Sequence, residues 1–153
     1  MCDVMVFRTK AVKVASLRKR GPISEQPEAW QRLAGFVSSQ GLTVTGPGVG
    51  IYYDTTWNPE DVNYEICLPV DKNGEAEGAI TFRELASTLV ASLIHRGSYD
   101  KMCESYKRLT EWIKANGYTI VGPPMEVYLR CPHLIDDAMG YVTDIQIPVA
   151  KQG

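Results

Sequence analysis

The chain contains an internal repeat that covers more than half of its length. Residues 13–53 align without a gap on residues 89–129, at a constant offset of 76, and fourteen of the forty-one pairs are identical. Ordinary composition would give roughly two or three matches by chance. Such a repeat indicates one supersecondary unit that is used twice, with a pseudo-twofold axis between the copies. The seam between the copies is therefore the first place to expect a binding site.

The composition restricts the classes of protein to consider. The 153 residues carry a net charge of −2, which gives no basic footprint for nucleic acid or an anionic membrane. No apolar run approaches the ~18 residues of a membrane span, and no signal peptide is indicated. The four cysteines are widely spaced and there are only two histidines. We therefore expect a cytoplasmic protein with reduced thiols, no metal and no cofactor.

Each copy has the pattern strand, helix, strand, strand. In copy one the expected elements are a strand within 4–18, a helix that ends at Gly41, and a hairpin of 49–54 with 62–70. In copy two they are a strand at 87–95, a helix that ends at Gly117, and a hairpin of 125–130 with 143–149. Ser24 and Asp100 are the expected N-caps of the two helices.

The repeat predicts one domain of the α+β class. Two copies, at about 4–70 and 84–149, would be joined by a polar linker at 71–83. A single copy cannot cover both its helix face and its sheet face, so the copies should share a core. We expect a duplicated strand–helix–strand–strand unit, with an antiparallel sheet and helices packed on it, and pseudo-twofold symmetry.

The most informative difference between the copies is Gly50 against Glu126. Glu126 is the only charged residue between Tyr118 and Leu129. Alternation along a strand places Glu126 and Tyr128 on one face and Val127 on the other. Two interpretations stay open on spacing alone. The carboxylate could face solvent, or it could lie in the seam, where aromatic rings and a desolvated charge would suit a lipophilic cation.

The aromatic residues fall into two groups. Those on helix faces are expected to be core residues: Trp30, Phe36, Tyr106 and Trp112. Those on strands or at loop edges are candidates for the wall of a pocket, where a tyrosine hydroxyl supplies a polar group: Tyr52, Trp57, Tyr64, Tyr99 and Tyr128.

Several segments of the chain resemble the GyrI-like small-molecule-binding family, whose module is also the effector-binding domain of multidrug-sensing transcription regulators. Residues 95–99 (HRGSY) resemble the family's His-x-Gly-Pro-Tyr turn, with Ser98 in place of proline. Residues 122–129 resemble its Gly-Pro-Pro-x-Glu-x-Tyr strand, residues 143–149 its closing strand, and residues 59–70 the equivalent hairpin of copy one. The match extends over nearly the whole chain.

The resemblance implies a ligand cleft between the copies. It also implies that Glu126 is the acidic residue that faces cationic, aromatic ligands, so ligand binding is assigned to Glu126 and the five candidate wall residues. Copy one has Lys19 where copy two has His95, and we expect His95 to be a structural histidine. Because the chain begins with the first strand, no helix-turn-helix segment is expected ahead of it, and any regulatory role would need a partner.

Three functions remain to be distinguished. The first is a stand-alone binding protein for amphipathic, cationic aromatic molecules. The second is a hydrolase of strained cyclopropane-bearing electrophiles, as some family members resemble, with Glu126 as the catalytic group and a tyrosine as acid. The third is an inhibitor or regulator of an unidentified protein partner, such as a topoisomerase. No Ser/His/Asp arrangement or Gly-x-Ser-x-Gly turn favours a general hydrolase.

Overall fold

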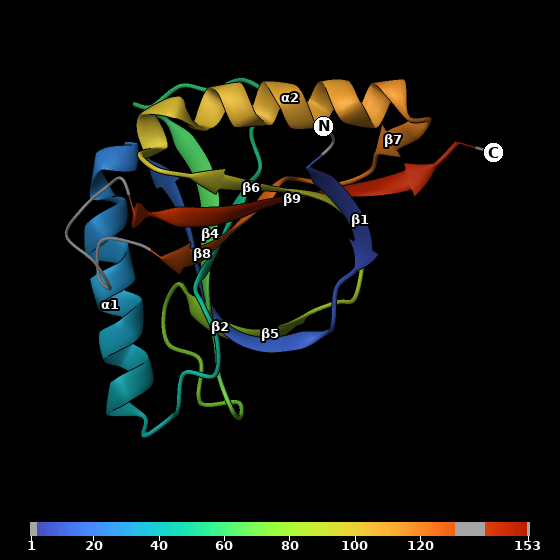
Figure 1. Ribbon diagram of the computed structural model, residues 1–153. Helices are drawn as coiled ribbons and strands as arrows, with labels where there is room; N and C mark the ends of the chain where they lie inside the picture. The colour runs from blue at the N-terminus through green and yellow to red at the C-terminus, as the bar shows by residue number, and fades with distance from the viewer. Residues whose placement is uncertain (1–2, 131–139, 153) are drawn as a thin grey trace. The chain divides into compact units, whose positions relative to one another are not determined.

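The computed structural model describes residues 3–130 and 140–152 (Figure 1). Its elements follow in the order β1 (Val4–Arg8), β2 (Val12–Gly21), a 3₁₀ turn η1 (Ile23–Glu25), α1 (Gln26–Ser39), β3 (Val49–Tyr52), β4 (Val62–Pro69), β5 (Ile80–Leu85), β6 (Leu89–Arg96), a 3₁₀ turn η2 (Tyr99–Lys101), α2 (Met102–Ala115), β7 (Tyr118–Ile120), β8 (Met125–Arg130) and β9 (Val142–Lys151). The predicted α+β class and the duplicated strand–helix–strand–strand order are confirmed.

The chain forms two compact units. Unit 2 contains residues 10–87, and unit 1 contains residues 1–9 together with 88–153. In unit 2 the strands follow the order β3-β4-β2-β5, and in unit 1 the order β1-β6-β9-β8, with β7 also paired to β9. The strand pairs within both units are antiparallel.

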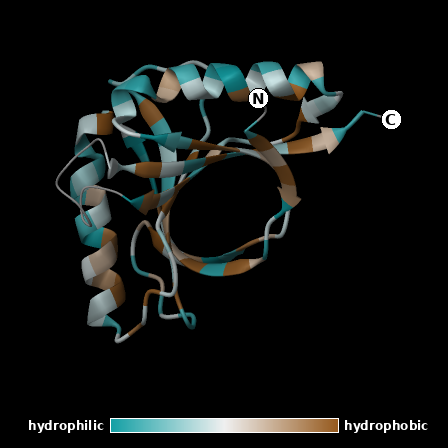
Figure 2. Cartoon of the chain, in the orientation of Figure 1, coloured by the Kyte–Doolittle hydropathy of each residue, from teal (hydrophilic) through white to brown (hydrophobic). Residues whose placement is uncertain are grey.

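Each unit has one helix packed on its sheet. In unit 2, Leu33 and Val37 of α1 are buried against strand residues such as Leu17 and Ile66. In unit 1, Leu109 and other apolar residues of α2 are buried against β6 and β9. The helix-face aromatics Trp30, Phe36, Tyr106 and Trp112 are partly buried against these clusters, as predicted. Figure 2 shows polar and apolar residues mixed along both helices, as expected for helices with one buried face.

The first expected strand is in fact two strands in different units. Residues 4–18 contain β1, which pairs with β6, and most of β2, which pairs with β4 and β5. The pairing of β1 with β6 ends next to Thr9, whose backbone N–H donates to the carbonyl of Thr88 at 2.8 Å. Both segments begin with an alternating Val-x-Val pattern, so periodicity alone could not separate them. The expected linker at 71–83 is also shorter, because β5 begins within it at Ile80.

The two expected helix N-caps were wrong. Glu25 occupies the N-cap position of α1 and makes no capping bond, and Ser24 lies in the 3₁₀ turn before it. Before α2, the hydroxyl of Ser98 accepts a hydrogen bond from the backbone N–H of Asp100 at 3.1 Å. A 3₁₀ turn precedes each helix, so Ser24 and Asp100 lie inside these turns and not at the N-cap positions. Among the described residues no helix is long and apolar enough to cross a membrane.

Candidate functional site

Glu126 lies on the face of the unit 1 sheet that carries α2. It is paired in register with Ile145 of β9, and Ile145 belongs to the core cluster beneath α2. Tyr128, two residues further along β8, lies on the same face, and Val127 lies on the other. Glu126 is half-buried. The carboxylate is therefore part of a helix-covered surface and is not a fully solvated side chain.

Two tyrosine hydroxyls hold the Glu126 carboxylate. Tyr106 of α2 donates to Oε2 at 2.6 Å, and Tyr128 of β8 donates to Oε1 at 2.9 Å. Hydrogen bonds of this kind fix the orientation of the carboxylate and leave it ionisable. We call Glu126, Tyr106 and Tyr128 the carboxylate cluster.

Burial raises the pKa of Glu126 above its ordinary value of 4.5. The two tyrosine hydrogen bonds and the neighbouring His95 act in the opposite direction without cancelling the effect of burial. The ionised form of Glu126 is thus less well solvated than a carboxylate in water. A cation that replaces the missing water beside this carboxylate would be favoured.

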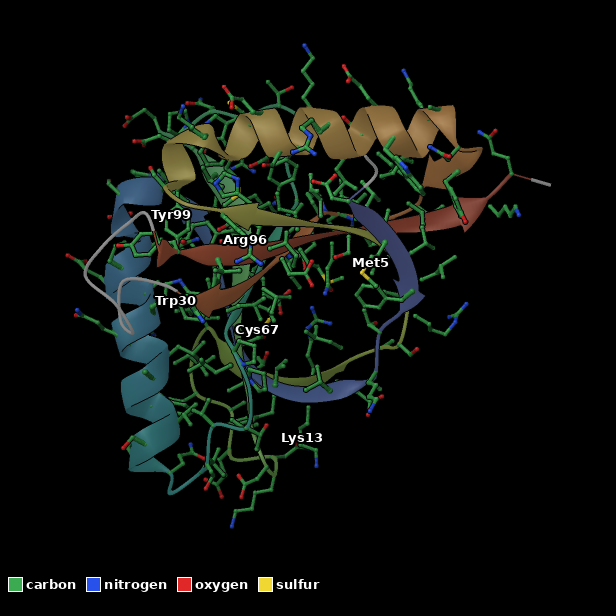
Figure 3. All side chains as sticks on the ribbon, viewed as in Figure 1. Met5, Lys13, Trp30, Cys67, Arg96 and Tyr99 are labelled. Carbon is green, nitrogen blue, oxygen red and sulfur yellow. The ribbon has the colours of Figure 1, made fainter. Side chains whose placement is uncertain are left out.

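Further aromatic rings adjoin the carboxylate cluster. The rings of Tyr99 and Tyr128 meet edge to face with centroids 6.2 Å apart, and Tyr99 also packs against Tyr141 at 5.2 Å. Tyr99, labelled in Figure 3, is 39% exposed, so part of its ring is open to solvent. Sequence reasoning missed Tyr141, because that residue lies directly before β9 and belongs to no periodic pattern.

Tyr106 was expected only as a core residue, and its hydroxyl was overlooked. The repeat did contain a signal for it. Copy one has Trp30 and Gly50 where copy two has Tyr106 and Glu126. The donor and the acceptor therefore change together between the copies.

His95 has the structural role that was expected of it. It is buried, with Nε2 2.8 Å from the carbonyl oxygen of Ser98 and Nδ1 2.7 Å from the hydroxyl of Ser105. A carbonyl can only accept, so Nε2 carries a proton, and in the neutral ring Nδ1 accepts from Ser105. His95 thereby joins β6 to the start of α2, next to the carboxylate cluster.

The other candidate residues lie in unit 2. The hydroxyl of Tyr52 accepts a hydrogen bond from Nε2 of Gln26 at 3.0 Å, and its ring centroid lies 6.5 Å from that of Tyr64. Tyr64 is fully buried in the core beneath α1. Trp57 is 62% exposed in the segment between β3 and β4. The structure thus groups Glu126, Tyr128 and Tyr99 in one unit, and Tyr52 with Tyr64 in the other.

Two surface hollows of about 370 and 330 Å³ lie elsewhere in unit 1. Both adjoin the ion pair between Asp3 and Arg108, and neither is lined by Glu126 or by the candidate tyrosines. The hydrogen bonds of the carboxylate cluster are a better guide to a site than these shallow depressions. No group of three or more Cys, His, Asp or Glu in the described part of the chain could hold a metal ion.

Comparison with known proteins gives a consistent result for the fold. A family model described as "GyrI-like small molecule binding domain" matches residues 3–150. The crystal structure of the EcmrR C-terminal domain has a TM-score of 0.91 and 27% identity, with 97% of each chain covered. An EcmrR–DNA complex is also similar, with a TM-score of 0.90 and 27% identity, but this chain spans only 57% of that one.

More distant structures share the fold alone. SAV2435, solved bound to tetraphenylphosphonium, has 14% identity and a TM-score of 0.64, with 97% of this chain and 94% of that chain covered. A hydrolase from Listeria innocua has 12% identity and a TM-score of 0.74, with 97% and 92% covered. No curated protein matches this chain in sequence.

Proposed function

Because the chain belongs to the family of GyrI-like small molecule binding domains, we propose that it binds an amphipathic, cationic aromatic molecule through Glu126. The observation that carries the proposal is the half-buried carboxylate held by two tyrosine hydroxyls. The carboxylate offers charge complementarity, and each aromatic face adds about 0.5–2 kcal/mol of cation–π attraction.

The repeat predicts that one cleft contains Glu126 together with Tyr52, Tyr64 and Trp57. This stays a prediction. A cytoplasmic location fits the free thiols of Cys67 and Cys103. A regulatory role is supported by the likeness to EcmrR in its complex with DNA.

The proposal is tested by titrating the protein with a fluorescent lipophilic cation and competing it with tetraphenylphosphonium. Glu126→Gln keeps the shape of the side chain but removes the charge, and it should weaken binding about tenfold or more, equivalent to about 1.4 kcal/mol. Glu104→Gln removes an exposed carboxylate from α2 and is the matched control. Equal affinity of the parent and Glu126→Gln would rule out the role assigned to Glu126.

The hydrolase alternative has one supporting observation. The Tyr106 hydroxyl lies 2.6 Å from the Glu126 carboxylate, so an acid and a carboxylate are already paired. Mass spectrometry after incubation with a cyclopropane-bearing electrophile distinguishes this function from binding alone. Recovery of unchanged compound at high protein concentration would count against catalysis.

A further inference from the structure

The two repeats carry a second pair of carboxylates, on the sheet faces opposite the helices. Glu65 lies on β4 and Asp144 on β9, each four residues before a proline that ends the matching run, Pro69 or Pro148. Their neighbours Ile66 and Ile145 pack under α1 and α2, so the two carboxylates point to the other face. The partners of these two equivalent groups differ.

In unit 2 a guanidinium neutralises the carboxylate. Arg83 of β5 donates to buried Glu65 twice, from Nε to Oε2 at 2.9 Å and from Nη2 to Oε1 at 2.8 Å. The hydroxyl of Tyr53 donates to Oε1 at 2.6 Å, and Ser16 supplies a further hydrogen bond. A carboxylate offers about four acceptor positions, so these four donor contacts occupy all of them.

In unit 1 the equivalent carboxylate has only neutral partners among the described residues. Ser92, the repeat counterpart of Ser16, donates to Oδ1 of Asp144 at 2.5 Å, and Nε2 of Gln146 donates to Oδ2 at 2.9 Å. Asp144 makes no ion pair with any residue that the structure describes. About two of its acceptor positions remain, which is the number that a bidentate guanidinium uses.

The reason for the missing cation is visible in the strand register. Arg83 lies opposite Val14, whose repeat counterpart is Val90, and Phe7 of β1 lies opposite Val90. Phe7 therefore takes the place of the arginine. The unit 1 sheet keeps the carboxylate and the serine of this arrangement but lacks the guanidinium.

We propose that Asp144 binds the guanidinium group of a small alkylguanidinium ligand, in the place that Arg83 fills beside Glu65. Asp144 is half-buried, so a cation can reach it while water is partly excluded. Its cross-strand neighbour Ile94 is 39% exposed, and Met5 of β1, labelled in Figure 3 and opposite Ser92, is 66% exposed. These two apolar side chains give the alkyl part of the ligand a surface to contact.

The arrangement favours guanidinium over ammonium. A planar guanidinium presents two parallel N–H donors to a carboxylate, whereas an alkylammonium is a compact, strongly hydrated charge. The site is independent of Glu126, which lies on the opposite face of the same sheet.

The proposal is tested by titrating this chain with n-butylguanidinium and recording the changes in its nuclear magnetic resonance chemical shifts. We expect saturable shifts at β6 and β9, binding tighter than that of n-butylammonium, and about tenfold or greater weakening in Asp144→Asn. Glu104→Gln, an exposed carboxylate, is the control. N-acetylarginine amide shows whether the site also accepts the arginine side chain of a peptide, or only the free small molecule.

A second variant keeps the test decisive if Asp144→Asn does not fold. Phe7→Arg places an internal guanidinium opposite Val90, as Arg83 is placed opposite Val14, and should abolish the binding of n-butylguanidinium. Absence of saturable shifts in the parent protein would overturn the proposal. Undiminished binding in either variant would also overturn it, because the ligand would then be held elsewhere.

Discussion

At the scale of single residues, one matched pair of differences distinguishes the repeats. Trp30 and Gly50 in copy one correspond to Tyr106 and Glu126 in copy two. A glycine cannot supply charge and a tryptophan cannot supply a hydroxyl, so only unit 1 has a carboxylate cluster. The hydrogen bond between Tyr128 and Glu126 agrees with the shared strand face that the sequence predicted for these two residues. The sequence alone does not predict that Tyr106 contacts Glu126, because an aromatic residue on a helix face is usually a core residue. Only the hydrogen bond from its hydroxyl to the carboxylate shows this further contact.

The raised pKa of Glu126 makes ligand binding and stability depend on pH in opposite ways. Between 4.5 and the raised pKa, the folded protein keeps a proton that the unfolded chain has lost. Stability should therefore fall as pH rises through this interval. Affinity for a permanently charged cation should instead rise, because binding requires the ionised carboxylate. Glu126→Gln should flatten both curves, as measured by denaturant titration and by dye binding.

At the scale of elements, the turn before α2 shows how a departure from a family pattern is accommodated. Ser98 stands where the resemblance leads one to expect proline, and its φ of −59° and ψ of 147° are values that proline adopts. Its hydroxyl caps the backbone N–H of Asp100, and its carbonyl accepts from His95. Serine thus keeps the backbone conformation and adds a capping bond.

Substitution at position 98 should separate these two contributions. Ser98→Ala loses the cap, at a cost of about 0.5–2 kcal/mol. Ser98→Pro also loses the cap but restricts the unfolded chain, a gain of about 0.4–1 kcal/mol. We expect the free energy of unfolding, from denaturant melts, to be higher for Ser98→Pro than for Ser98→Ala. Ser38→Ala, at an exposed helical position, should show no loss. The reverse order of the two position-98 variants would show that the folded backbone does not accept proline here without strain.

Element types were more predictable than their pairing. Apolar residues at helical spacing located α1 and α2, and Gly41 and Gly117, with φ of 69° and 78°, follow the two helices as expected. Strand partners could not be obtained in this way. Alternation indicates that a segment is a strand and which residues share a face, but it does not identify the neighbour of that strand.

At the scale of the whole molecule, the units do not coincide with the sequence repeats. β1 precedes copy one in the chain but pairs with β6 of copy two, and β5 precedes copy two but pairs with β2 of copy one. The strand that precedes each repeat in the chain, which we call its leading strand, therefore pairs with a strand of the other repeat. The repeat alignment began at residue 13, after β1, and so contained no information on this exchange.

Deletion of residues 1–9 should affect unit 1 and spare unit 2. Without β1, the β6 amides whose hydrogen bonds point to β1 lose their partners, while the alternate amides keep their bonds to β9. Hydrogen exchange should accelerate about tenfold or more at alternate residues of β6. Amides of β4 serve as the internal control, and uniform protection along β6 would contradict the assignment of β1 to this unit.

The exchange of leading strands has a consequence for inheritance. A gene fragment that encodes one repeat does not encode one folding unit, because it supplies an edge strand for the missing half and lacks its own. Recombination that transferred a single repeat to another reading frame would leave both products incomplete. Selection can therefore alter the two repeats independently, as at Glu126 and Asp144, but must retain them as a pair.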